Sequence, residues 1–171
     1  MSNGNLVKSV NNKYQADISN LNYTPERPSS VPADYTFAGW YDNEACEGDK
    51  AYDFTGKTMP SHNITLYAKW VAPTYTAKAH LNLTGSGSDT YKTLEKIKYG
   101  SKINKSDMPT VVDSTGTVLS KGDDEYKVTV PDGYKWLGWS TYSDGEYKLY
   151  NFDTEVYADK ELYPNYISEA K

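Results

Sequence analysis

The chain contains an internal repeat. The segment Tyr35–Tyr41 reads YTFAGWY and the segment Tyr134–Ser140 reads YKWLGWS, so both carry a Gly-Trp pair two residues after an aromatic residue. The two tryptophans, Trp40 and Trp139, lie 139 − 40 = 99 positions apart. A repeat of this length constrains the fold more than any single motif, because it requires one structural unit to occur twice.

Two further motifs repeat at nearly the same spacing. Tyr52–Phe54 (YDF) corresponds to Tyr150–Phe152 (YNF), an offset of 150 − 52 = 98. Leu66–Trp70 (LYAKW) corresponds to Leu162–Tyr166 (LYPNY), an offset of 162 − 66 = 96. The near-constant offset over three motifs predicts two tandem copies of one small unit.

The repeat predicts a first unit over residues 1–72 and a second over residues 73–171. The interval between corresponding tyrosines is 12 residues in the first unit and 35 in the second, which predicts an insertion near 110–127. We expect this insertion to project from the second unit as a hairpin or mobile loop, because long surface loops cost little free energy. The same matching places Ile18 at the position of Leu94.

The local pattern predicts strands rather than helices. Apolar residues alternate with polar ones from Tyr75 to Leu83, a period of two that is typical of a half-buried strand. Pro164 lacks a backbone N–H and predicts that the last strand lies at a sheet edge. The remaining expected elements are a first strand at Leu6, Lys8 and Val10, a turn at 85–89, a strand or short helix at 93–99, and strands at 128–130, 134–140 and 161–166.

Composition excludes several functional classes. The net charge of −5 and the pI of about 5.0 disfavour nucleic-acid binding, which needs a basic surface. No run of about 18 apolar residues exists, so we expect no membrane insertion. The single cysteine, Cys46, permits no intrachain disulfide.

No residue pattern indicates catalysis or a cofactor. The two histidines, His62 and His80, are distant in sequence and have no second ligand at metal-binding spacing. Acidic neighbours of Cys46 are expected to raise its thiol pKa, which disfavours a nucleophile. We therefore expect no enzyme activity, no metal and no cofactor.

The repeated aromatic residues have a structural interpretation and a binding interpretation. Gly39 and Gly138 are expected to open room for a neighbouring ring or to permit a β-bulge, and the tryptophans that follow them are expected to be core residues. Strict alternation places Trp40 on one face with Ala38, and Phe37 on the opposite face, where aromatic rings either pack in the core or stack on sugars. The candidates for an exposed aromatic platform in the second unit are Tyr142, Tyr147 and Tyr150, and the candidate glycan-binding residues are Trp136, Tyr142 and Tyr147.

Residues 35–70, with Gly39-Trp40-Tyr41, the Tyr52–Phe54 turn and the closing segment Leu66–Trp70, resemble the Listeria–Bacteroides repeat, the B-repeat of internalin B. The second unit resembles it more loosely. The residues that carry the resemblance or the repeat, and that we expect to anchor the two units, are Gly39, Trp40, Leu66, Trp70, Gly138, Trp139 and Leu162.

The resemblance implies an α+β, mostly β fold of two tandem β-grasp-like, ubiquitin-like units in a bacterial surface or secreted protein. It implies no shared catalytic residues. The expected function is that of a non-enzymatic extracellular repeat module, a spacer and protein-interaction or adhesion surface within a larger cell-wall or secreted protein. The alternative is a carbohydrate-binding accessory module, so the expected partner is an unknown protein or glycan at the cell surface.

Overall fold

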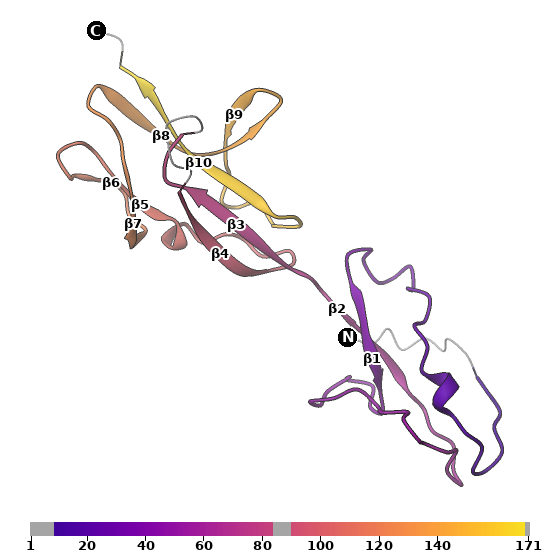
Figure 1. The fold of residues 1–171 in the computed structure, drawn as a ribbon. Helices are drawn as coiled ribbons and strands as arrows, with labels where there is room; N and C mark the ends of the chain where they lie inside the picture. The colour runs from indigo at the N-terminus through magenta and orange to yellow at the C-terminus, as the bar shows by residue number, and fades with distance from the viewer. Residues whose placement is uncertain (1–8, 84–89, 170–171) are drawn as a thin grey trace. The chain divides into compact units, whose positions relative to one another are not determined.

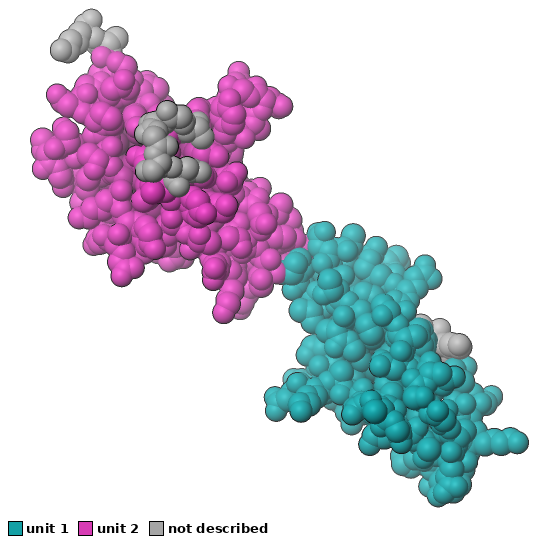
Figure 2. All heavy atoms as spheres, viewed as in Figure 1, with its two compact units in different colours: residues 1–73 teal, residues 74–171 magenta. Residues whose placement is uncertain are grey.

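The computed structural model describes residues 9–83 and 90–169 and is mostly β (Figure 1). The chain divides into two compact units, residues 1–73 and 74–171 (Figure 2). The mostly β part of the predicted fold class is confirmed, whereas the β-grasp assignment stays a prediction.

Helical structure is confined to two short 3-10 turns among the described residues, Ser19–Leu21 (η1) and Lys105–Asp107 (η2). In that part of the chain, no helix is long and apolar enough to cross a membrane.

The first unit is built on one antiparallel strand pair. β1 (Thr36–Tyr41) pairs with β2 (Tyr67–Val71) in a two-stranded sheet. Its buried core consists of Ile18, Trp40 and Phe54, and half-buried apolar side chains pack around them. This core is small, so each aromatic side chain contributes a large share of the buried apolar area.

The second unit contains two sheets. A five-stranded sheet has the order β4-β3-β10-β8-β9, and a three-stranded sheet has the order β6-β5-β7. Their bounds are β3 Thr74–His80, β4 Tyr91–Lys98, β5 Pro109–Val112, β6 Val118–Ser120, β7 Asp123–Thr129, β8 Tyr134–Ser143, β9 Glu146–Leu149 and β10 Lys160–Ser168. One buried cluster joins the two sheets, with Trp139 and Leu162 from the larger and Val111 and Val128 from the smaller.

Each unit has a β-bulge at the glycine of its Gly-Trp pair. Gly39 has a φ of +111° and Gly138 a φ of +139°, values that side chains other than glycine rarely adopt. The pairing register of β1 with β2 shifts between Phe37 and Trp40, and that of β8 with β10 shifts at the corresponding place. These register shifts confirm the expected bulge and show that it occurs in both units.

The strand partners of the bulged segments correspond as well. Trp40 lies opposite Ala68, and Trp139 lies opposite Pro164. The turn that follows each bulged strand makes the same contact, because the backbone N–H groups of Tyr52 and Tyr150 donate to the carbonyls of Trp40 (2.6 Å) and Trp139 (2.8 Å). The two tryptophans therefore occupy equivalent positions, 8% and 2% exposed respectively.

The bulge overturns the expected alternation of side chains. Phe37 packs against the core with its ring centroid 5.5 Å from that of Trp40, while Ala38 is exposed. The rings of Trp136 and Trp139 lie 5.8 Å apart in the same way. The expectation that Trp40 shares a face with Ala38 was wrong, because the extra residue of a bulge shifts the alternation by one position.

The prediction that Ile18 occupies the position of Leu94 was also wrong. Leu94 lies on β4, whereas Ile18 lies just before η1. The counterpart of Ile18 is Ile103, and both residues are buried. Each lies two residues after a residue whose backbone carbonyl accepts a hydrogen bond from the segment that follows the YDF or YNF turn. These hydrogen bonds are Met59 N–H to Ala16 O and Val156 N–H to Ser101 O, both 2.8 Å.

The insertion in the second unit is shorter than predicted and does not project as a free loop. The distance from Ile18 to Trp40 is 22 residues and that from Ile103 to Trp139 is 36, a difference of 14. All four residues of β5 are buried, and Val128 on β7 is 1% exposed. The mobile-loop alternative at 110–127 was wrong, because Val111 on β5 belongs to the buried core cluster. The hairpin alternative holds for β5 and β6, which pair antiparallel and leave Val118 and Leu119 of β6 exposed.

The prediction of an edge strand from Pro164 was wrong for β10, which lies between β3 and β8. Pro164 is compatible with this position because the parallel pairing with β3 ends at Leu162. At Pro164 only β8 is paired with β10, so no ladder hydrogen bond to β3 is lost.

Two sequence predictions concern residues outside the described part of the chain, namely Leu6 and Lys8 in the first strand of unit 1 and the turn at 85–89. Val10, which was assigned to the same strand, belongs to no strand.

Replacing Gly39 by alanine is expected to destabilise the first unit by about 1–3 kcal/mol. The added Cβ would lie 2.5 Å from the Cβ of Ala51, in a backbone conformation that alanine disfavours. The matched control is Gly56→Ala, whose φ is +64° and whose added Cβ meets nothing within 4 Å. Urea unfolding followed by tryptophan fluorescence measures both losses, and equal losses would contradict the proposed importance of the bulge.

Candidate functional site

The outer face of the five-stranded sheet follows from the alternation of its strands. Ala79, Leu162 and Trp139 belong to the buried core cluster, on the inner face. The residue after each of them lies on the opposite face, because successive side chains of a strand point to opposite sides. That rule places His80 and Tyr163 together on the outer face.

A continuous band of rings crosses this outer face. The rings of His80 and Tyr163 are stacked, with centroids 4.3 Å apart and an interplanar angle of 10°. Tyr91 lies 5.6 Å from His80 on one side, and Tyr147 lies 5.9 Å from Tyr163 on the other. Tyr142 extends the row at 4.8 Å from Tyr147. We call these five residues the aromatic band.

A small side chain allows the band to cross the middle of the sheet. Ser140 lies opposite Tyr163 in the β8–β10 register and is fully buried. Its hydroxyl accepts a hydrogen bond of 3.0 Å from the Asn165 side-chain amide. Because serine is short, the ring of Tyr163 can reach that of Tyr147 beyond it.

Polar and charged side chains surround the band. An open groove of about 560 Å³ lies beside it. The Nζ of Lys78 lies 4.7 Å from the ring centroid of Tyr91, and the Nε2 of His80 lies 3.4 Å from a carboxylate oxygen of Glu161. The groove is lined by Thr76, Lys78, Thr141, Tyr142, Asp159, Lys160, Glu161 and Tyr163. Within the band Tyr91 and Tyr142 are exposed, Tyr147 and Tyr163 are half-buried and His80 is 3% exposed. The exposed rings and the hydrogen-bonding groups beside them can stack on a flat ligand and bond to its rim.

The structure brings together two of the three candidate glycan-binding residues. Tyr142 is 51% exposed and contacts Tyr147, its direct cross-strand partner. Trp136 does not join them, because the bulge at Gly138 turns its side chain toward the core, against Trp139. Of the residues predicted to anchor the two units, Trp40, Trp70, Trp139 and Leu162 are buried, and Gly39, Leu66 and Gly138 are half-buried.

Sequence reasoning missed His80, Tyr91 and Tyr163 as members of the band. The signal for two of them was present, since His80 is one of the polar residues of the alternating segment and Tyr163 follows the repeated Leu162. The sequence could not place Tyr91 in the band, because its position beside His80 is set by the pairing register of β3 with β4.

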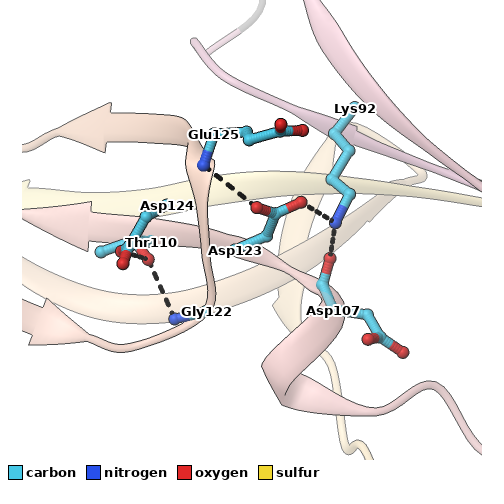
Figure 3. A network of polar contacts seen from close by, with 7 residues as sticks. All are labelled: Lys92, Asp107, Thr110, Gly122, Asp123, Asp124 and Glu125. Carbon is cyan, nitrogen blue, oxygen red and sulfur yellow. Dashed lines mark hydrogen bonds and ion pairs between the residues drawn. The ribbon is translucent and has the colours of Figure 1, made fainter.

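A second polar cluster ties the three-stranded sheet to the larger one (Figure 3). The ammonium group of Lys92 on β4 donates to the Asp123 carboxylate (2.7 Å) and to the Asp107 carbonyl (2.5 Å). On the neighbouring strand, the Thr110 hydroxyl donates to the Asp124 carboxylate (2.8 Å) and accepts from the Gly122 N–H (3.0 Å). We call this the Lys92 cluster, and its internal pairing indicates a structural role.

The carboxylates of this cluster are stabilised in the charged form. The hydrogen bond from Lys92 is the main cause that lowers the pKa of Asp123, and the Glu125 N–H adds to it. The hydrogen bond from Lys121 is the main cause that lowers the pKa of Asp124, followed by that from Thr110.

The structure adds two facts on metal binding and thiol chemistry. Over residues 9–83 and 90–169, no group of three or more His, Cys, Asp or Glu side chains is placed to hold a metal ion. Cys46 is 1% exposed, and burial is the largest cause that raises its pKa. The nearby acidic residues, which the sequence suggested as the cause, are not the dominant one.

Comparison with known proteins gives a family match for the first unit. The model of the Listeria-Bacteroides repeat domain matches residues 1–69. Internalin H of Listeria monocytogenes is 31% identical over 105 residues, which cover 61% of this chain and 14% of that protein. A protein of Evansella cellulosilytica, described as a Gly-rich membrane protein, is 30% identical over 122 residues, which cover 68% of this chain and 12% of that protein.

The chain thus spans only about a seventh and an eighth of the length of these two relatives. No solved structure matches it.

The Lys92 cluster predicts an acid dependence of the second unit's stability. A carboxyl group whose folded pKa is lowered stabilises the fold at pH above its unfolded pKa of about 3.9, and this contribution is lost as the pH falls through the lower folded value. Thermal unfolding between pH 6 and pH 2 should therefore show a smaller acid-induced loss for Lys92→Gln than for the parent. Lys148→Gln, at an exposed position of β9, is the control and should follow the parent. Parallel curves for all three proteins would show that Asp123 is not stabilised by Lys92.

Proposed function

Residues 1–69 of this chain belong to the Listeria–Bacteroides repeat family, and we propose that the chain is a non-enzymatic repeat module of a bacterial surface or secreted protein. In this proposal it acts as a spacer and as a protein-interaction or adhesion surface, outside the cell and within a larger protein. The family match and the similarity to parts of two much longer proteins support the surface module.

One observation carries the proposal. The positions that the two units share are occupied by core residues, Gly39-Trp40 on β1 and Gly138-Trp139 on β8, which fix the bulge and the packing. Of the outer aromatic band, only Tyr163 has a repeated counterpart, Tyr67, whereas the sequence reveals none for His80, Tyr91, Tyr142 and Tyr147. Repetition of core residues supports a fold that is used as a building unit.

The protein-interaction proposal is tested with the whole chain immobilised on a biosensor. Purified extracellular matrix and cell-surface proteins are passed over it, beside an array of soluble glycans. We expect saturable binding to at least one protein, no glycan signal, and no change on addition of a chelator. Glycan binding alone, or turnover of any array component, would contradict the proposal.

The second candidate function is carbohydrate binding, and the aromatic band is the observation that favours it. Tyr142 and Tyr147 present neighbouring rings at the edge of the sheet, and Thr141 and Asp159 line the adjoining groove. Sugar rings stack on exposed aromatic faces, while hydroxyl and carboxylate groups bond to their rims.

For this candidate, Tyr142→Ala is expected to reduce saccharide affinity at least tenfold without changing the melting temperature, because the side chain is 51% exposed. The comparison variant is Tyr134→Ala, which removes a similarly exposed tyrosine at the far end of the same strand. Isothermal titration with soluble oligosaccharides measures both. Equal affinity in the two variants would exclude the aromatic band as the sugar site.

A further inference from the structure

The β8–β9 hairpin brings two tyrosine rings into contact. Its turn lies at Asp144 and Gly145, both with a positive φ, and it pairs Tyr142 directly with Tyr147. The two ring centroids lie 4.8 Å apart, with an interplanar angle of 52°. Tyr142 is 51% exposed, so a reagent in solution can reach its ring. The pair forms the β9 end of the aromatic band, at the edge of the five-stranded sheet.

The geometry of this pair is close to that of two phenol rings joined by a carbon–carbon bond. In such a biaryl the ring planes are twisted, neither coplanar nor perpendicular, as they are here at 52°. The ring centres of a biaryl are separated by two ring radii and one bond, which is slightly less than the 4.8 Å between Tyr142 and Tyr147. A small rotation of the exposed Tyr142 side chain therefore brings the two ring edges into bonding range.

Two other tyrosine pairs meet edge to face and lack this geometry. The centroids of Tyr99 and Tyr157 are also 4.8 Å apart, but their planes are inclined at 71°. Those of Tyr134 and Tyr166 are 5.6 Å apart at 85°. In an edge-to-face pair the edge of one ring meets the plane of the other, whereas a biaryl bond joins two ring edges. These pairs are therefore matched comparisons for the pair on the hairpin.

We propose that Tyr142 and Tyr147 form an oxidative cross-linking site, at which a haem peroxidase with hydrogen peroxide joins the two rings as dityrosine and ties β9 to β8. Each tyrosine gives up one electron and its phenolic proton, and the two radicals couple through ring carbons next to the hydroxyl groups. The hydrogens on these two carbons then move, as protons, to the phenolic oxygens and restore the aromatic rings. One hydrogen peroxide accepts the two electrons and two protons and becomes two waters.

The cross-link gives the sheet edge a covalent tie that a disulfide cannot supply in this chain. Cys46 is the single cysteine and is buried, so no disulfide can form within the chain. β9 has four residues and lies at one end of the strand order, next to β8. A bond between the two rings keeps this short edge strand from separating in local opening. The site goes beyond the proposed function and does not depend on it, since coupling needs only the hairpin and the oxidant.

The test treats the full chain, at low concentration, with hydrogen peroxide and a haem peroxidase. We expect dityrosine fluorescence and a monomer whose mass is lower by two hydrogen atoms. Because the chain has 17 tyrosines, the linked residues are identified by mass spectrometry of the digested protein. Cleavage at Asp144 or Glu146 separates Tyr142 from Tyr147 unless their rings are joined, so the expected product is two peptides held together by the cross-link.

Single substitutions locate the cross-link. Tyr142→Phe should lower the dityrosine yield at least fivefold. Tyr134→Phe and Tyr157→Phe, which alter the two edge-to-face pairs, should give the yield of the parent. Since Tyr142 is 51% exposed, its variant is expected to keep the melting temperature of the parent. If it does not, Tyr147→Phe replaces it with the same expected loss.

Amide hydrogen exchange measures the effect of the cross-link on the sheet edge. The amides of β9 should exchange at least fivefold more slowly in the oxidised parent than before oxidation, with no such change in Tyr142→Phe treated in the same way. Four outcomes would overturn the proposal. They are the absence of dityrosine, cross-links confined to other tyrosines or to pairs of chains, a yield that Tyr142→Phe leaves unchanged, and exchange of β9 amides that the cross-link does not slow.

Discussion

The glycine before each repeated tryptophan determines the packing of both units. A positive φ at Gly39 and Gly138 inserts one extra residue into the strand and shifts the alternation of side chains. As a result, two aromatic residues three positions apart, such as Phe37 and Trp40, both reach the core side. The tryptophan carbonyl then accepts the N–H of Tyr52 or Tyr150, which attaches the following turn to the strand. Strand pairing, core and turn therefore depend on one backbone conformation.

The two units complete this arrangement to different degrees. In the second, β3 and β4 close one side of the core, and β5 and β7 close another, so Trp139 is 2% exposed. The Lys92 cluster holds β7 against β4 by charge-assisted hydrogen bonds. In the first unit, the described residues contribute the β1–β2 pair and a small buried core of Ile18, Trp40 and Phe54.

Sequence reasoning identified the features that depend on local pattern. The repeat, the β3 strand and the bulge at the Gly-Trp pair follow from spacing, alternation and the conformational freedom of glycine. It failed where the answer depends on tertiary contact. Ile18 was matched to Leu94 because the series Ile18, Leu21 and Tyr23 has the same spacing as Leu94, Ile97 and Tyr99. Only the hydrogen bonds at Ala16 and Ser101 reveal that Ile103 is its counterpart. The polar turns of the insertion hid the burial of Val111 and Val128, and the band around His80 required the register between strands.

Amide hydrogen exchange at Tyr52 and Tyr150 tests the central claim most directly. If the bulge organises each unit, these two N–H groups, which donate to the tryptophan carbonyls, exchange only through global unfolding of their own unit. The account predicts protection factors for both amides that equal the highest in the same unit and fall together when that unit is destabilised by urea. Exchange of either amide at the rate of an unstructured peptide amide would contradict it.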